Sequence, residues 1–162
     1  MRPVDNAKPA SAGVRFPPPV IMVLHLLAGV LLSRVVPLNV LPAAAHSHAR
    51  GIGGALLLGG VVLLVMSMRQ FTRADIDMRP WMPTAGIMDK GLYSWTRNPM
   101  YLSFAIIYLG IALLIPSEWA VLTLIPALLV IRYYVIAKEE RYLEATFGEP
   151  YVRYKARVRR WL

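Results

Sequence analysis

The chain has 162 residues, of which 57% are hydrophobic, and it carries a formal net charge of +9. With a mean hydropathy of +0.50, it does not have the composition of a soluble domain, which would contain fewer apolar residues spread in amphipathic periods. Because there is no cysteine, disulfides, thiolate metal sites and a cysteine nucleophile are excluded.

Four apolar stretches follow one another along the chain. Residues 16–33, 51–68 and 99–117 contain no Asp, Glu, Lys or Arg, and residues 119–137 contain only Arg132. A helix needs roughly 20 residues to cross a hydrocarbon core of about 30 Å. The pattern predicts an all-α polytopic membrane protein with about four transmembrane helices, because no alternating barrel pattern is present.

The flanking segments predict the topology. Residues 1–15 are polar and rich in Pro and Ala, and we expect a disordered tail there, followed by one membrane domain over 16–162. Most basic residues lie between spans two and three or after span four. The positive-inside rule then puts both termini and the 69–98 loop in the cytoplasm, in a bacterial inner membrane or its equivalent. Anionic lipid explains this charge, and no nucleic-acid-binding module accompanies it.

The C-terminal segment predicts a short amphipathic helix. Gly148 is a natural helix C-cap and Pro150 suits the first turn of a new helix. Tyr151, Tyr154, Val158 and Trp161 recur at helical spacing, with basic residues between them. We expect this helix to lie on the membrane surface.

Spans three and four are joined by the short turn 116–118. A short turn makes two helices antiparallel neighbours, so residues 98–101 and 134–140 must lie close together. This layout suits a polar small molecule held beside a lipid phase.

Each candidate residue also has a simple structural explanation. Glu139 and Glu140 either bind a ligand ammonium or ribose, or form a solvated helix end. Arg97, Asn98 and Pro99 open span three, where they either cap the helix or bind an anion at its N-terminus.

Aromatic and intramembrane residues leave similar alternatives. Tyr93, Trp95 and Tyr101 either stack on a nucleobase or belong to an interfacial belt. Arg132 precedes Glu139 by seven residues, which predicts one shared helix face, and it either serves the site or snorkels to the interface. The two outer-loop histidines, His46 and His48, have no further ligand nearby, so we expect no metal.

Three motifs together resemble the isoprenylcysteine carboxyl methyltransferase and phospholipid methyltransferase family. They are Gly91-Leu92-Tyr93-Ser94-Trp95-Thr96-Arg97-Asn98-Pro99-Met100-Tyr101, Glu139-Glu140-Arg141-Tyr142-Leu143 and Phe147-Gly148-Glu149-Pro150-Tyr151-Val152-Arg153-Tyr154. The resemblance covers residues 85–162, which would form the cofactor-binding half.

The resemblance implies methyl transfer from S-adenosylmethionine at the membrane face. The implied cofactor contacts are Ile87, Met88, Tyr93, Asn98, Pro99, Met100, Tyr101, Glu139 and Glu140. Two positions depart from the family. Asn98 stands where the family often has His, and Val135 stands where prenylcysteine enzymes have an arginine that binds the substrate carboxylate.

We therefore expect a membrane methyltransferase acting on a lipid-like or small hydrophobic acceptor, such as an isoprenylcysteine carboxylate. Arg132, Tyr101 and Arg97 are the expected catalytic residues, with Arg132 a substitute for the arginine missing at Val135. Two alternatives stay open: an NADPH-dependent membrane reductase, since sterol reductases are similar to this family in their C-terminal fold, and a non-catalytic membrane scaffold.

Overall fold

The computed structural model describes residues 11–38, 40, 42–77, 79, 82–115 and 117–162. The α-helices are α1 (Pro18–Val35), α2 (Ala43–Ala74), α3 (Pro99–Leu114), α4 (Glu118–Leu122), α5 (Leu124–Val130), α6 (Ala137–Phe147) and α7 (Glu149–Arg157). A 3-10 turn lies at Gly91–Ser94, and a π-helical segment lies at Ile131–Ile136. No strand occurs among the described residues, which confirms the all-α prediction.

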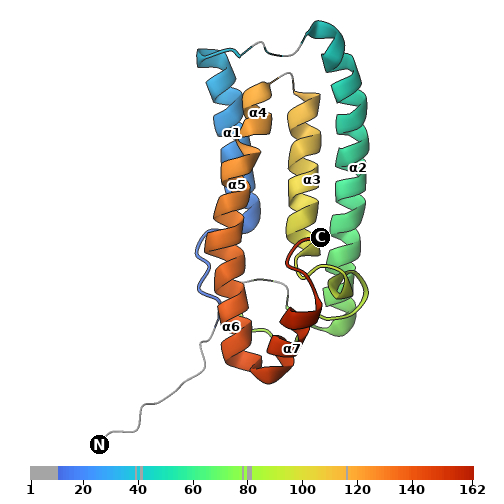
Figure 1. The fold of residues 1–162 in the computed structure, drawn as a ribbon, viewed down its shortest axis with the longest axis vertical. Coiled ribbons are helices and arrows are strands. Elements are labelled where there is room, and N and C mark those ends of the chain that lie inside the picture. Colours follow the sequence, from blue (N-terminus) through green and yellow to red (C-terminus); the bar gives the residue numbers. More distant parts are fainter. Residues whose placement is uncertain (1–10, 39, 41, 78, 80–81, 116) are drawn as a thin grey trace, which may run out of the picture.

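The long helices run side by side, and α7 lies across one end of them (Figure 1). Three segments are long and apolar enough to cross a membrane, namely Pro18–Val35, Ser47–Ala74 and Glu118–Phe147. The remaining span, the third in the predicted order, is α3, a shorter apolar helix of 16 residues. The chain is therefore a polytopic helical membrane protein, as its sequence predicts.

Glycines allow α2 and α3 to touch backbone to backbone. A Cβ added at Gly53 would lie 2.8 Å from the carbonyl oxygen of Gly110, and one added at Gly110 would lie 2.6 Å from the backbone nitrogen of Leu57. Gly29 of α1 is packed in the same way against α4, where the backbone Cα of Ala120 would lie 2.7 Å from an added Cβ. Small residues thus set the helix spacing, as is typical of packing in lipid.

The fourth span is one long helix with two irregularities. Pro126 has no backbone N–H and its ring crowds the carbonyl of Leu122, which explains why the regular helix is interrupted at Thr123 between α4 and α5. Residues Ile131–Ile136 then form the π-helical segment, and Ile131, Val135 and Ile136 within it are fully buried. This segment connects the membrane half of the helix to α6.

The predicted C-terminal helix is present as α7, but its apolar face is covered by protein. Tyr151, Tyr154 and Val158 are buried and pack against a group of partly buried apolar residues. Those neighbours are Ile87, Leu143 and Phe147. The helix ends at Arg157, so the end of the periodic pattern lies in an extended segment.

The N-terminal expectation falls mostly outside the described residues, since 1–10 are not described. Residues 11–15 contact the fourth span. Val14 is buried in the core, Lys138 Nζ donates a hydrogen bond to the carbonyl of Gly13, and the N–H of Arg15 donates to the Tyr134 hydroxyl.

Candidate functional site

A cavity of about 130 Å³ lies at the end of the bundle where α3 begins and α6 runs past it. A cavity of this volume has room for several water molecules or for part of a small ligand. Its walls come from the end of α2, the connection to α3, the first turn of α3, α6 and α7. The lining residues are Ala12, Phe71, Asp77, Arg79, Met82, Thr84, Gly86, Ile87, Met88, Tyr93, Arg97, Asn98, Met100, Tyr101, Glu139, Glu140, Tyr142, Leu143, Tyr151 and Tyr154.

The cavity brings together most of the site residues expected from the sequence. The expected residues that line it are Ile87, Met88, Tyr93, Arg97, Asn98, Met100, Tyr101, Glu139 and Glu140. Pro99 and Arg132 do not line it. Pro99 is a fully buried residue that opens α3.

Tyr101 and Glu139 join the two helices at the cavity. The Tyr101 hydroxyl donates a hydrogen bond of 2.5 Å to Glu139 Oε1. This contact verifies the inference that the N-terminal end of α3 lies beside the acidic end of the fourth span. A hydrogen bond to a charged acceptor is stronger than a neutral one, so it holds the Glu139 carboxylate in a defined position.

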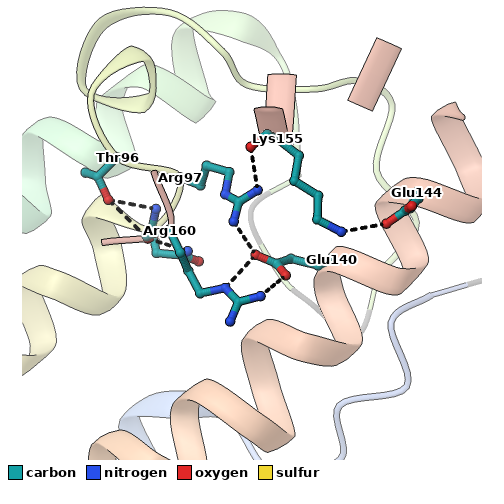
Figure 2. A network of polar contacts seen from close by, with 7 residues as sticks. Thr96, Arg97, Glu140, Glu144, Lys155 and Arg160 are labelled. Atoms are coloured by element: carbon teal, nitrogen blue, oxygen red, sulfur yellow. Dashed lines mark hydrogen bonds and ion pairs between the residues drawn. The ribbon is translucent and has the colours of Figure 1, made fainter. Parts of the chain in front are cut away.

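Glu140 lies between two guanidinium groups (Figure 2). Arg97 Nη2 is 3.0 Å from Glu140 Oε1, and the two side chains are 9% and 8% exposed. Arg160 donates from Nε to Glu140 Oε1 at 2.9 Å and from Nη2 to Oε2 at 2.6 Å. Glu140 is thus a buried carboxylate whose charge is fully paired.

Arg97 is held on several sides but keeps one donor free. Its Nη1 donates to the carbonyl of Lys155 at 3.2 Å, and its backbone N–H donates to the carbonyl of Arg159 at 2.9 Å. Its Nε is buried and has no hydrogen-bond partner among the residues that the structure describes. Such an orphaned buried donor is uncommon, and it belongs to a residue that lines the cavity.

Asn98 precedes α3 but its side chain does not cap the helix. Its Nδ2 donates instead to the carbonyl of Arg160 at 2.8 Å. The first N–H groups of a helix have no partner within the helix, and the side chain of the preceding residue does not serve them here. Met100 and Tyr101 of this first turn both line the cavity.

Tyr93 is a buried wall of the cavity. Its ring packs edge-on against Phe71 with centroids 5.1 Å apart, and its carbonyl accepts a hydrogen bond of 2.7 Å from the Tyr154 hydroxyl. Burial raises the pKa of both phenols, Tyr93 and Tyr154, above the ordinary value. Trp95, by contrast, is 82% exposed and does not line the cavity.

Arg132 is exposed, and its guanidinium lies over the ring of Tyr133, 5.6 Å from the centroid. The predicted face shared with Glu139 assumed two α-helical turns over seven residues. A π-helical turn closes with an i→i+5 hydrogen bond and therefore takes more residues. Arg132 itself belongs to the π-helical segment Ile131–Ile136, whose wider turn shifts its alignment with Glu139. Val135 is fully buried in the core.

Several lining residues had no sequence signal. Asp77 and Arg79 form an ion pair of 2.6 Å, and the hydrogen bonds from Arg79 lower the pKa of Asp77 to about 2. Thr84 donates its backbone N–H to the Tyr142 hydroxyl at 3.2 Å. These residues come from a connection without regular periodicity, so only its unusual length pointed to it.

No group of three or more metal-ligating side chains occurs within the described residues.

Comparison with models of known protein families identifies the family of this chain. The model of the phospholipid methyltransferase family matches residues 49–150. The chain belongs to this family. The match covers the part of the chain that supplies most of the cavity.

One relative is a protein of Haemophilus influenzae that is described as uncharacterized. It is 49% identical over 63 residues, which make up 39% of this chain and all of that protein. No solved structure matches the chain. Membership in the phospholipid methyltransferase family, together with the apolar helices, supports a membrane methyltransferase.

Proposed function

We propose that this protein transfers a methyl group from S-adenosylmethionine to a lipid-like acceptor, with the reaction taking place at the cavity between α3, α6 and α7. One observation carries the proposal. The cavity collects the residues expected to bind the cofactor, apart from Pro99, and all of them lie within the segment matched by the phospholipid methyltransferase family.

The residues present fit the cofactor chemically. Glu139 offers a carboxylate to a ribose hydroxyl or to the ammonium group. The buried Arg97 Nε has no hydrogen-bond partner within the described part of the chain, and a ligand carboxylate would give it one. Met88, Tyr93 and Leu143 supply apolar and aromatic walls for an adenine ring. When bound, the cofactor supplies a methyl group carried on a positively charged sulfur.

The chain's own contribution is positioning. Transfer between two bound molecules requires close alignment, and holding reactants in that arrangement provides a large part of the rate enhancement. The hydrogen bond between Tyr101 and Glu139 and the paired charge of Glu140 fix two walls of the cavity. A carboxylate acceptor needs no base, whereas an amine acceptor must lose a proton, which the Tyr101–Glu139 pair can accept.

The acceptor enters from the bilayer under this proposal. Helices of the bundle expose large apolar side chains over their membrane portions, including Leu31 of α1, Leu58 of α2 and Leu129 of α5. A lipid-like molecule can therefore reach the bundle without leaving an apolar phase. With basic segments on the cytoplasmic side, both termini and the cavity face the cytoplasm.

Calorimetric binding of S-adenosylhomocysteine to the detergent-purified protein tests the proposal, with NADPH and the Glu139→Ala variant as controls. Micromolar binding by the natural chain, weakened in Glu139→Ala and absent for NADPH, is the expected result. Binding of NADPH alone would favour a reductase. A folded protein that binds neither molecule would favour a scaffold.

A further inference from the structure

The segment that follows α7 returns to the beginning of α3. We name residues Val158–Trp161 the C-terminal clasp. Arg159 forms an isolated parallel bridge with Thr96, and its carbonyl accepts the N–H of Arg97 at 2.9 Å. The carbonyl of Arg160 accepts from Thr96 Oγ1 at 3.3 Å and from Asn98 Nδ2 at 2.8 Å. The clasp therefore holds the three residues that precede α3.

The side chain of Arg160 anchors this clasp. Its two hydrogen bonds to Glu140, at 2.9 and 2.6 Å, engage both oxygens of a carboxylate that is only 8% exposed. Bidentate pairs of this kind fix geometry as well as charge. Figure 2 shows the guanidinium groups of Arg97 and Arg160 approaching the same carboxylate. Glu140 raises the pKa of Arg160 through these contacts, so the anchor stays charged.

The clasp does not line the cavity but contacts residues that do. Arg159 and Arg160 are not lining residues, whereas Arg97, Asn98 and Glu140 are. Each of these three makes a direct contact with the clasp. The side-chain amide of Asn98 donates its hydrogen bond to the carbonyl of Arg160 and does not cap α3. The C-terminal clasp therefore sets the direction of this side chain.

We infer that Arg160 is a positioning residue for the ligand bound in the cavity, acting through Glu140, Arg97 and Asn98. This inference rests on the proposed function. A purely architectural tether would change the stability of the ligand-free protein. A positioning residue changes ligand affinity in a protein that is still folded, and restoring a guanidinium group restores that affinity.

The test compares Arg160→Ala with Arg153→Ala in the full-length chain. Arg153 lies on α7, is 68% exposed and pairs with the exposed Glu149 at 3.7 Å, so Arg153→Ala also removes one arginine and serves as the matched control. Three quantities are measured for each: the Kd of S-adenosylhomocysteine by calorimetry, the unfolding temperature without ligand, and the Kd in the presence of millimolar guanidinium chloride. Arg160→Lys is measured in parallel, because it keeps the charge but loses the bidentate fork.

We expect Arg160→Ala to bind S-adenosylhomocysteine about 10- to 100-fold more weakly, the range typical of lost supporting contacts and small misplacements. Guanidinium should recover part of that loss, Arg160→Lys should be intermediate, and Arg153→Ala should bind as the natural chain does. Unchanged binding by Arg160→Ala overturns the inference. Weakened binding that guanidinium does not restore, accompanied by an equal drop in ligand-free stability, also overturns it.

Two further outcomes separate this inference from the proposed function. If Arg160→Ala does not fold, Arg160→Lys decides, since its unchanged affinity overturns the inference and an affinity loss rescued by guanidinium supports it. If the natural chain itself does not bind S-adenosylhomocysteine, the proposed function fails and the inference fails with it.

Discussion

The hydroxyl of Tyr101 lies 2.5 Å from Oε1 of Glu139, although the two residues are 38 positions apart. Tyr101 belongs to the first turn of α3 and Glu139 to α6. Both line the cavity. The contact ties the two halves of the helical hairpin together at the place where we propose that the cofactor binds.

Tyr101→Phe keeps the ring and removes only this hydrogen bond. A hydrogen bond to a charged group contributes about 1.5–3 kcal/mol, and its loss frees the Glu139 carboxylate to leave its position. We expect S-adenosylhomocysteine to bind roughly tenfold more weakly or worse, as measured by calorimetry. Tyr108→Phe, the same change on the same helix but outside the cavity lining, is the control. Equal affinities for Tyr101→Phe and the natural chain would contradict the role of this contact.

Arg97 and Arg132 should differ sharply when each is replaced by alanine. Arg97 is buried and paired with Glu140, so Arg97→Ala leaves that carboxylate with one partner and costs about 1–3 kcal/mol in the free energy of unfolding. Arg132 is exposed and away from the cavity, so Arg132→Ala should alter neither stability nor S-adenosylhomocysteine affinity. Thermal unfolding and calorimetry measure both. A marked loss of affinity in Arg132→Ala would restore the role expected from the sequence.

Two neighbouring glycines of α2 form a matched pair. An added Cβ at Gly53 would meet the backbone of α3 at 2.8 Å, whereas one at Gly54 would meet nothing within 4 Å. We expect Gly53→Ala to destabilise the protein by about 1–3 kcal/mol through overpacking. Gly54→Ala should be neutral or slightly stabilising, by less than about 1 kcal/mol. Unfolding in detergent compares them, and equal unfolding temperatures would argue against backbone contact between α2 and α3.

Alkaline conditions should destabilise the end of the molecule around α7. Burial raises the pKa of Tyr93, Tyr151 and Tyr154 above the ordinary value of 10.0. A group whose folded-state pKa is raised contributes stability that is complete below its unfolded pKa and is lost as the pH rises above it. We expect the unfolding temperature to fall as the pH rises above about 10.

Tyr154→Phe provides the control for that pH dependence. It removes one of the titrating phenols and should make the alkaline fall shallower. It also loses the hydrogen bond to the carbonyl of Tyr93, at a cost of about 1 kcal/mol at neutral pH. Identical pH profiles for Tyr154→Phe and the natural chain would show that buried tyrosines are not responsible.

Local patterns predicted much of the fold. The uncharged stretches predicted the membrane helices, because a backbone inside lipid must satisfy its hydrogen bonds internally, as a helix does. The short turn at 116–118 predicted the antiparallel hairpin. That hairpin places Tyr101 close enough to Glu139 for a hydrogen bond. Both predictions depend on features that lie close together in sequence.

The parts that were missed depend on register and on distant contacts. The spacing between Arg132 and Glu139 predicted one shared face, but no periodicity in the sequence indicated that Arg132 lies in a π-helical segment. Asn98 has the identity of a helix cap, yet a carbonyl 62 residues away engages its side chain. A single sequence does not predict which distant carbonyl competes for such a donor.

The π-helical segment at Ile131–Ile136 restricts how the length of this chain can vary during evolution. Removing or adding one residue there would rotate the following helix about its axis by a large part of a turn. Glu139 would then no longer contact Tyr101. The connection between α2 and Gly91 has no such rotational coupling. Among natural relatives, we therefore expect gains and losses of residues to accumulate in that connection, while the interval from Ile131 to Glu140 keeps its length even where its residues differ.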